Sequence, residues 1–408
     1  MVRRRLAISI VSFVLLSSTI ILADFMSEDY REVSLSLREE EILDAIYNAA
    51  KSGLIKESDA NHLFSLIARS KKVISLKHPL SDDLANILYR FEKIAEGKGL
   101  GEKDILVLQQ TLEVNLRYIN LNKKDPELFE RFFHPSLSFP FVYIRGQGFN
   151  FHPINALNYA TELLEYEKDN SSFIEVMRDL LEYIEERSYK NLSYGVMKFY
   201  FAWERESIPW ISSISQGIGS AYFAIAYSIT GEHEFERAAR LLANSFQVPF
   251  EMGGFRIELD YGPFYVEYSN APFDLVLNGF MLSLKGLWIY LQIIEDNATL
   301  KAFLSGITTL ESLLPKYDVR ISLTRSWSAY SLLYNQSVEN YPVFHGTASE
   351  RYHRLHVRLL YFLGRASGSS VLKAYFEKWD SYLVEAGLKS EVERSKQEYE
   401  FWISITSG

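Results

Sequence analysis

The sequence predicts a mainly α-helical protein whose helix hairpins form an (α/α) toroid, or barrel, with a short β-hairpin excursion. Apolar residues recur three and four positions apart from residue 37 to about 122, and again from 154 to the C-terminus, as on one face of a helix. Between residues 247 and 268, β-type segments with glycine turns interrupt this spacing. An apolar stretch behind three arginines also predicts an N-terminal membrane anchor ahead of the helices.

The anchor is predicted over Leu6–Ala23, an uncharged stretch that follows arginines at positions 3–5. At about 1.5 Å per residue, roughly 18 residues span ~27 Å, close to the ~30 Å hydrocarbon core of a bilayer. Cleavage after Ala23 would put Ile21 where a signal peptidase site needs a small residue, so an uncleaved anchor is favoured. The positive-inside rule then places the rest of the chain outside the cytoplasm. The alternative is secretion after signal cleavage.

These patterns divide the chain into four segments. Residues 1–24 form the anchor, 25–130 a helical N-terminal region, 131–388 the (α/α) domain and 389–408 a C-terminal tail. The (α/α) domain begins where Phe, Tyr, Pro and Gly crowd into residues 131–152, which indicates a short strand and a loop. No chemistry is visible in region 25–130, so it is interpreted as a helical cap or spacer.

The composition excludes several classes of chemistry. The chain has 408 residues, a net charge of −9 and no cysteine, so disulfides, thiolate metal sites and cysteine nucleophiles are excluded. The negative charge argues against nucleic acid as a partner, whereas a local cluster of Arg or Asn can still bind an anionic sugar. His353 and His356 have a spacing that metal ligands can use, but no third ligand completes a site. Neither a metal nor a cofactor is therefore expected.

Four segments together carry a resemblance to a known family. They contain an aromatic-Pro-Ile entry into a helix, a Trp-x-Ser-x-x-x-Gln-Gly segment, a Glu-Tyr pair before Val-Leu-Asn-Gly-Phe, and a Tyr-His-x-x-His segment. They are FHPINALNYA at 151–160, PWISSISQG at 209–217, VEYSNAPFDLVLNGFMLSLKGL at 266–287 and RYHRLHVRLL at 351–360. In this order they resemble the D-glucuronyl C5-epimerase family over roughly residues 145–385. KWDSYL at 378–383 is similar to the family's ending, whereas a helical pattern stands where the family has a large N-terminal β domain.

The resemblance implies catalytic roles for three tyrosines and one carboxylate. Tyr268 and Glu267 match the family's Glu-Tyr pair, although Ser269 replaces the proline that follows that pair. Tyr352 matches the tyrosine of Tyr-His-x-x-His. Tyr330, in SWSAYSLL, matches a third catalytic tyrosine.

The resemblance also implies which residues contact the substrate. They are polar side chains of the matched segments, namely Asn278, Gln216, His353 and His356. The family has an arginine three positions after its third tyrosine, but Leu333 stands there in this sequence. Arg325, on the other side of the same loop, is the candidate that compensates for Leu333 in substrate binding.

Each candidate residue also has a purely structural interpretation. A tyrosine is most often a core aromatic whose hydroxyl is satisfied. Glu267 can be a solvated or Arg-paired carboxylate, and Asn278 can satisfy backbone groups at a helix start. Gln216 can be a packing residue beside Gly217, and the two histidines can simply brace Tyr352.

The resemblance implies epimerisation at C5 of uronic acid residues, of the D-glucuronyl to L-iduronyl type, in a glycan. A base removes the proton alpha to the carboxylate, and an acid returns one to the opposite face of the ring. The same carbanion can instead expel the C4 substituent, so a polysaccharide lyase is the first alternative. A non-catalytic glycan-binding or assembly protein is the second, and Leu333 favours it. The expected partner is a uronate-containing oligo- or polysaccharide, and a homodimer is left open.

Overall fold

The computed structural model describes residues 40–121, 125–203, 207–322, 325–334 and 342–406. In these ranges the chain is mainly helical with small antiparallel sheets, which confirms the helical class predicted from the sequence. The predicted anchor, Leu6–Ala23, lies outside the described residues. None of the helices within the described ranges is both long enough and apolar enough to cross a membrane.

Contacts between residues divide the chain into two compact units. The first contains the residues up to Tyr183 together with Lys198–Pro209, and the second contains Ile184–Met197 together with Trp210–Gly408. The domain boundaries predicted from the sequence, after residues 24, 130 and 388, stay predictions. All residues predicted to be catalytic or to bind the substrate belong to the second unit.

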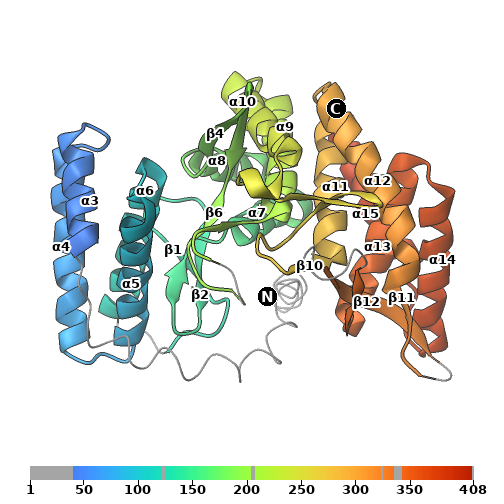
Figure 1. Cartoon of the computed structure of the whole chain (residues 1–408), viewed down its shortest axis with the longest axis horizontal. Coiled ribbons are helices and arrows are strands. Elements are labelled where there is room, and N and C mark those ends of the chain that lie inside the picture. The colour runs from blue at the N-terminus through green and yellow to red at the C-terminus, as the bar shows by residue number, and fades with distance from the viewer. Residues whose placement is uncertain (1–39, 122–124, 204–206, 323–324, 335–341, 407–408) are drawn as a thin grey trace. The chain divides into compact units, whose positions relative to one another are not determined.

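Four helices open the first unit. They are α3 (Glu40–Lys51), α4 (Glu57–Ser75), α5 (Ser81–Lys98) and α6 (Glu102–Asn120). α5 packs against the other three, and Figure 1 shows these helices as neighbours. Their buried faces carry the apolar residues whose spacing predicted them, such as Ile42 and Ile46 in α3 and Ile87 and Phe91 in α5. Full burial of such a side chain contributes about 1.5–3 kcal/mol.

A small sheet and two further helices complete the regular structure of the first unit. The elements are β1 (Arg131–Phe133), β2 (Pro140–Ile144), β3 (Gly148–Asn150), α7 (Pro153–Glu162), a π-helical turn (Leu163–Glu167), α8 (Asn170–Leu181) and β6 (Lys198–Phe199). The order β1-β2-β3 is antiparallel throughout, so the region predicted as one strand and a loop contains three strands. The buried guanidinium of Arg90 in α5 donates to the carbonyl of Gln147 over 3.0 Å and to that of Tyr200 over 2.7 Å. These hydrogen bonds tie the helices to the sheet.

Seven helices dominate the second unit. They are α9 (Ser213–Thr230), α10 (His233–Asn244), α11 (Leu277–Leu291), α12 (Asn297–Tyr317), α13 (Glu350–Ser367), α14 (Ser370–Glu385) and α15 (Val392–Thr406). α9 packs against α10 and α11, α11 against α12 and α13, and α13 against α14 and α15. A Cβ atom at Gly286 would collide with the backbone of Gly217, so glycine at this crossing lets α9 and α11 approach closely. Almost all of α11 is buried, which makes it the central helix of this unit.

The strands of the second unit confirm the predicted β excursion at residues 247–268 and correct the prediction of helices elsewhere. They are β4 (Glu185–Tyr189), β5 (Leu192–Val196), β7 (Trp210–Ile211), β8 (Arg256–Leu259), β9 (Gly262–Tyr265), β10 (Phe273–Val276), β11 (Asp318–Arg320), β12 (Ser326–Tyr334) and β13 (Val343–Thr347). β8 and β9 form an antiparallel hairpin inside residues 247–268, as predicted. The prediction of helices elsewhere is wrong at the β4–β5 hairpin and at a sheet in which β12 pairs with β10, β11 and β13.

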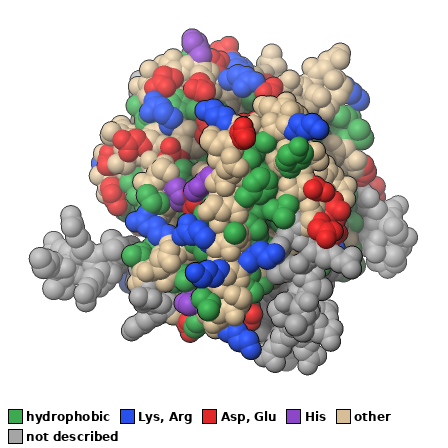
Figure 2. Space-filling view, turned by 90° about the vertical axis from the view of Figure 1, so that its left-hand side faces the viewer, with side chains coloured by type: hydrophobic (Ala, Val, Ile, Leu, Met, Phe, Trp, Pro, Cys, Tyr) green, Lys and Arg blue, Asp and Glu red, His purple; other side chains and the backbone are tan. Residues whose placement is uncertain are grey.

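One face of the molecule is mixed in charge. Figure 2 shows acidic and basic side chains both spread across the face that it draws, with hydrophobic side chains between them. The net charge of −9 is therefore not gathered as a single negative field on that face.

Candidate active site

Tyr330 lies at a β-bulge in β12. Its two neighbours along the strand pair with consecutive residues of β13, Thr347 and Gly346, so Tyr330 is the extra residue of the bulge. A bulge increases the local twist and re-aims the side chain that it carries. The ring of Tyr330 packs against that of Tyr352, with centroids 4.7 Å apart and planes tilted by 59°. Two of the three predicted catalytic tyrosines are therefore in contact.

Tyr352 is held by the start of α13. Ser349 caps this helix, and the N–H of Tyr352 donates to its Oγ over 3.4 Å. Serine is favoured at this position because its hydroxyl satisfies an N–H that has no partner within the helix. The Tyr352 side chain is only 7 % exposed, so packing against Tyr330 and the capped helix start together fix its place.

Glu267 lies against the start of α11. Its side chain is 8 % exposed, and a Cβ atom added at Gly279 would stand 2.5 Å from its Oε2. The absence of a side chain at position 279 is therefore what leaves room for the carboxylate. A negative charge beside a helix N-terminus is favourable because the N–H groups there carry partial positive charge.

Asn278 is the second residue of α11 and lies next to Gly279 in the chain. Its side chain is 5 % exposed, and its Oδ1 is a buried acceptor with no hydrogen-bond donor among the described residues. Leaving such an acceptor unsatisfied costs about 1–3 kcal/mol. A ligand hydroxyl or amide that donates to this oxygen would remove that cost.

Tyr268 follows Glu267 in the loop after β9. It is partly exposed, and its ring centroid lies 5.9 Å from that of Trp210 in β7. The hydroxyl of Ser269 accepts a hydrogen bond from the N–H of Ile211 over 3.3 Å. The residue that replaces the family's proline therefore ties the Tyr268 loop to β7, which a proline side chain could not do.

The sheet of β10, β12 and β13 links the residues at the start of α11 to the pair Tyr330 and Tyr352. β10 runs directly into α11, at whose start Glu267 lies, and its last residue, Val276, pairs with Ser331 of β12. Ser331 is the neighbour of Tyr330, which contacts Tyr352. The predicted catalytic residues therefore belong to elements that are connected through β10 and β12. The assignment of Tyr268 and Tyr352 as an opposed pair stays a prediction.

His353 braces α13 from inside the protein. Its Nδ1 accepts from the N–H of Ser328 over 3.2 Å, its Nε2–H donates to the carbonyl of Trp379 over 3.0 Å, and its ring stacks 3.8 Å from that of Trp327. Burial lowers the pKa of His353 to about 4. The imidazole is therefore neutral near pH 7, and both nitrogens are used within the protein.

His356 lies one turn further along the same helix and is fully buried. Its Nδ1 is 2.8 Å from the hydroxyl of Ser328, which is also 2.7 Å from Nδ1 of His353. Burial holds the pKa of His356 well below its ordinary value. One serine of β12 therefore bridges both histidines, and this geometry favours the bracing role over contact with a substrate.

Gln216 is also fully buried. Its Oε1 accepts from the N–H of Met197 over 3.0 Å, and its amide nitrogen donates to the carbonyls of Met197 and Ser212 and to Ser215 Oγ. The side chain thereby fastens the end of β5 to the first turn of α9. Its assignment as a substrate contact stays a prediction, and the hydrogen bonds favour the packing role.

Two arginines flank the strand and helix that carry Tyr330 and Tyr352, and the assignment of Arg325 to substrate binding stays a prediction. Arg325 is exposed, and its guanidinium lies 4.5 Å from the centroid of the Trp327 ring. Arg351 is half-buried and directly precedes Tyr352. Burial lowers the pKa of Arg351 to about 10, although attraction to the ionised Tyr352 opposes this effect.

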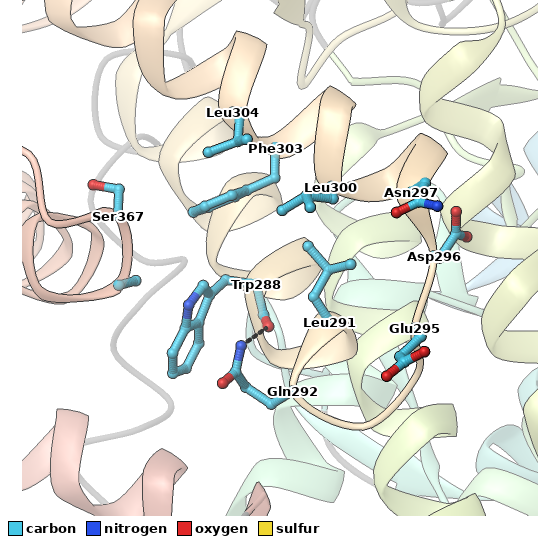
Figure 3. A pocket seen from close by; sticks show the side chains of 11 residues that line it. Trp288, Leu291, Gln292, Glu295, Asp296, Asn297, Leu300, Phe303, Leu304 and Ser367 are labelled. Atoms are coloured by element: carbon cyan, nitrogen blue, oxygen red, sulfur yellow. Dashed lines mark hydrogen bonds between the residues drawn. The ribbon is translucent and has the colours of Figure 1, made fainter.

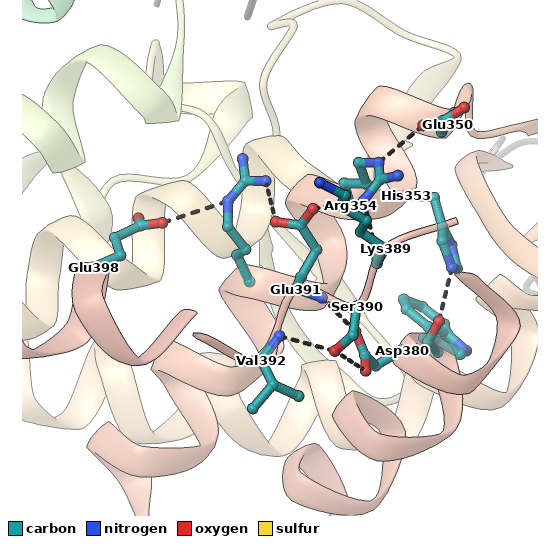
Figure 4. A network of polar contacts seen from close by, with 11 residues as sticks. Glu350, His353, Arg354, Asp380, Lys389, Ser390, Glu391, Val392 and Glu398 are labelled. Carbon is teal, nitrogen blue, oxygen red and sulfur yellow. Dashed lines mark hydrogen bonds and ion pairs between the residues drawn. The ribbon is translucent and has the colours of Figure 1, made fainter. Parts of the chain in front are cut away.

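The C-terminal segment holds the outer side of α13. Arg354 donates to Glu350 over 2.9 Å and to Glu391 over 2.7 Å, and Arg358 donates to the other oxygen of Glu391 over 3.0 Å. Figure 4 shows these pairs, together with the ion pair between Arg358 and Glu398. The predicted tail thus begins with residues that fix the helix carrying Tyr352.

A cavity of about 490 Å³ lies at the far end of the same helices. Trp288 and Leu291 near the end of α11, Leu300 and Phe303 of α12, and Ser367 at the end of α13 line it, as Figure 3 shows. Asn278 and Leu291 stand near opposite ends of α11, which at about 1.5 Å per residue is ~20 Å long. The cavity is therefore separate from the tyrosines.

The mainly helical second unit contains all three candidate tyrosines and Glu267, and two of the tyrosines, Tyr330 and Tyr352, are in contact. Residues 190–381 match the family model described as D-glucuronyl C5-epimerase C-terminus. The match covers slightly less than half of the chain. It confirms the resemblance and contains every candidate residue of the site.

Two relatives show how far the similarity extends. The chain is 29 % identical over 189 residues to a D-glucuronyl C5-epimerase of Caenorhabditis elegans. The aligned stretch covers 42 % of this chain and 29 % of that protein. The chain is also 26 % identical over 198 residues to an uncharacterized protein of Methanocaldococcus jannaschii. That aligned stretch covers 47 % of this chain and 58 % of that protein. The chain thus spans less than two thirds of either relative.

Proposed function

We propose that this protein inverts C5 of uronic acid residues in a glycan, converting D-glucuronyl to L-iduronyl residues. The observation that carries the proposal is the contact between Tyr330 and Tyr352 at the bulge of β12, inside the part of the chain that matches the epimerase family. The buried carboxylate of Glu267 beside the start of α11 supports it.

The chemistry needs two proton-transfer groups on opposite faces of the sugar ring. A base removes the C5 proton, and the electron pair of the C–H bond moves into the C5–C6 bond to give an enediolate. A proton returned to the opposite face of C5 then inverts the centre. Tyrosine can fill either role, but a phenol with an ordinary pKa of about 10 acts as a base only beside positive charge or donors.

We assign Tyr268 and Tyr352 to the two faces, with Tyr330 relaying a proton to or from Tyr352. The ring contact between Tyr330 and Tyr352 supports this relay. Asn278 offers a buried acceptor at the start of α11, and a hydroxyl of the sugar is the donor that it suits. Glu267, next to Tyr268, supplies a negative charge that can hold a proton during the reaction.

Deuterium exchange separates this function from its alternatives. The protein is incubated with uronate-containing glycans in heavy water, and both C5 deuterium and ultraviolet absorbance are followed. Deuterium at C5 without new absorbance is the expected result. Absorbance of an unsaturated uronate would instead identify a lyase acting by β-elimination. Glycan binding without either signal would leave a non-catalytic binding or assembly protein and contradict the epimerase.

We further propose that the helices of the second unit are part of an (α/α) toroid. α9, α11 and α13 are consecutive neighbours, and α10, α12 and α14 pack against them one by one. This pairing of inner and outer helices is what such a fold repeats. An experimental structure in which these helices form an open stack would contradict the proposal.

We also propose that Leu6–Ala23 anchors the catalytic domain outside the cytoplasm. The three arginines before this apolar run support the orientation. Fractionation of cells that make the full chain tests the proposal, with recovery from membranes expected. Recovery of the intact chain in the cytosol would contradict it.

A further inference from the structure

We infer that His345 carries protons between the tyrosine pair, Tyr330 and Tyr352, and the solvent, so that the site regains its starting protonation state after each inversion at C5. The inference rests on the proposed function, because it names how the tyrosines of that site exchange protons with water. It also gives a role to a histidine that lies outside the four segments that resemble the family.

Inversion by two opposed groups leaves both of them in the wrong state for the next substrate. The base has gained the proton of C5, and the acid has given its own proton to the opposite face. A further turnover in the same direction needs one proton to leave and another to enter, in exchange with water. Tyr268 is partly exposed, whereas Tyr352 is only 7 % exposed. The buried side of the site therefore needs a path for protons.

His345 lies close to Tyr330 in the irregular part of the sheet. The pairing of β12 with β13 skips Tyr330 on one strand and His345 on the other, with the pair of Ser331 and Gly346 between them. Adjacent strands lie about 4.8 Å apart and rise about 3.3 Å per residue, so the Cα atoms of Tyr330 and His345 are on the order of 8 Å apart. One or two water molecules can bridge large side chains at that separation.

The imidazole of His345 is held by residues of two other strands. Its Nδ1 lies 2.7 Å from a carboxylate oxygen of Asp274 in β10 and 3.3 Å from the hydroxyl oxygen of Ser331 in β12. Asp274 pairs directly with Leu333, which is two positions from Ser331 on the same strand. Direct partners and residues two apart share a face of a sheet, so Asp274, Ser331 and the ring of His345 stand on one face.

The second ring nitrogen is the one available for proton transfer. Within the described ranges, Nε2 of His345 has no hydrogen-bond partner, and 43 % of the side chain is exposed. A neutral ring that donates Nδ1–H to the carboxylate of Asp274 carries its lone pair on Nε2. A proton can therefore bind at Nε2 and leave from it again, while Asp274 stays ionised and keeps the ring in place.

Exposure to solvent rises along the proposed path. Tyr352 is buried, Tyr330 is half-buried and His345 is exposed. His353 and His356, which lie next to Tyr352 on α13, are fully buried and bind within the protein. His345 is therefore the histidine that the geometry puts between the tyrosine pair and water.

Buffer dependence tests this shuttle, because imidazole in solution can carry the proton that a missing side chain no longer carries. C5 exchange over many turnovers is measured in heavy water at low buffer and then with rising imidazole. His345→Ala should lose at least about tenfold, less than the ~10²–10⁴-fold of a direct acid or base, and imidazole should restore most of the loss. Its first turnover, followed with protein in excess over glycan, should match wild type because the site starts in the correct state.

Two further variants separate proton transfer from packing. His345→Gln keeps a polar side chain that cannot pass on a proton, so it should behave as His345→Ala does. Asp274→Asn removes the charge that holds the ring, and imidazole should relieve its smaller loss as well. His233→Ala is the matched control: the His233 ring lies 3.0 Å from Glu236 on α10, and its variant should keep wild-type exchange at every imidazole concentration.

The outcomes distinguish this inference from the proposed function. A folded His345→Ala protein with wild-type exchange at low buffer would overturn the shuttle. A loss that imidazole leaves unchanged, or that is equally large in the first turnover, would also overturn it, while the epimerase would stand. Wild type that exchanges no C5 proton under any condition would refute the epimerase and the shuttle together.

Discussion

Oε2 of Glu267 occupies the space beside Gly279 so closely that a Cβ atom there would stand 2.5 Å away. Gly279→Ala must therefore push the carboxylate from its place. A shift of about 1 Å in a catalytic group can cost on the order of 10²-fold in rate, so C5 deuterium exchange should fall by about that factor. Alanine is the better helix former, by up to ~1 kcal/mol, so lower helix propensity would not explain the loss.

Gly346→Ala is the control for this substitution. Gly346 lies in β13 near the bulge, and no atom would stand within 4 Å of an added Cβ. Exchange should therefore be close to that of wild type. If Gly279→Ala is folded and equally active, the position of the Glu267 carboxylate does not matter for the reaction.

Removal of single hydroxyls tests the tyrosine assignments. Tyr352→Phe and Tyr268→Phe should each lower C5 exchange by roughly 10²–10⁴-fold, which is the usual contribution of a general acid or base. With two opposed groups, one variant should fail more on the D-sugar and the other more on the L-sugar. Tyr330→Phe should slow exchange in both directions if its hydroxyl relays the proton to Tyr352.

Tyr334→Phe, on the same strand as Tyr330, provides the comparison. Tyr334 is buried in β12 and has no assigned role in proton transfer. Its variant should keep wild-type exchange. Equal losses in all four variants would point to a general effect on the fold rather than to proton transfer.

The helices were predictable because their signal is local. Ile42 and Ile46 recur at helical spacing and are buried, so the periodicity alone identifies the buried face. The sheet around β12 was not predictable in the same way. Phe273 pairs with Tyr334, some sixty positions later in the chain, and no local pattern records such a pairing. The roles of the site residues depend on these distant contacts.

The three predicted catalytic tyrosines lie in the part of the chain that matches the family model, but the motifs could not separate residues that contact a substrate from residues that brace the fold. His353 and His356 are held by Ser328, which belongs to a strand that the sequence did not predict. The missing arginine at position 333 was visible in the sequence. The contact between His345 and Asp274 was not, because it joins strands that the sequence did not predict.

Acid should destabilise the protein through His353. Its pKa is about 4 in the folded chain and about 6.5 when unfolded. Between these values the unfolded chain binds more protons, so the free energy of unfolding is highest above pH 6.5 and falls as the pH decreases toward 4. This group alone should remove about 2 kcal/mol between pH 7 and pH 5, and His356, whose pKa is also lowered, should add to the loss.

Urea unfolding at a series of pH values measures this effect. His353→Gln should reduce the slope of stability against pH between 5 and 7, because glutamine does not titrate there. His233 is exposed, with 84 % of its side-chain surface accessible, and His233→Gln is the control for the loss of a histidine that is not buried. A pH-independent wild type over this range would show that His353 is not held neutral by burial.

Glu391 should be a stability determinant even though it lies outside the tyrosine site. It binds Arg354 and Arg358 together, over 2.7 and 3.0 Å, and only 7 % of its side chain is exposed. Glu391→Ala would leave two partly buried guanidinium groups without this carboxylate. Since hydrogen bonds to charged groups contribute about 1.5–3 kcal/mol, the free energy of unfolding should fall by about that amount.

Urea denaturation measures the loss as a lower midpoint with an unchanged slope m. Glu393→Ala is the matched control: Glu393 pairs with Lys396, but 80 % of its side chain is exposed, so its loss should change stability by less than about 1 kcal/mol. Arg354 and Arg358 lie on α13, which carries Tyr352 in its first turn, and Glu391→Ala should lose C5 exchange only in proportion to the fraction unfolded. Wild-type exchange per folded molecule would show that Glu391, Arg354 and Arg358 stabilise the fold without taking part in proton transfer. Equal stability of the two variants would show instead that the C-terminal segment does not hold α13.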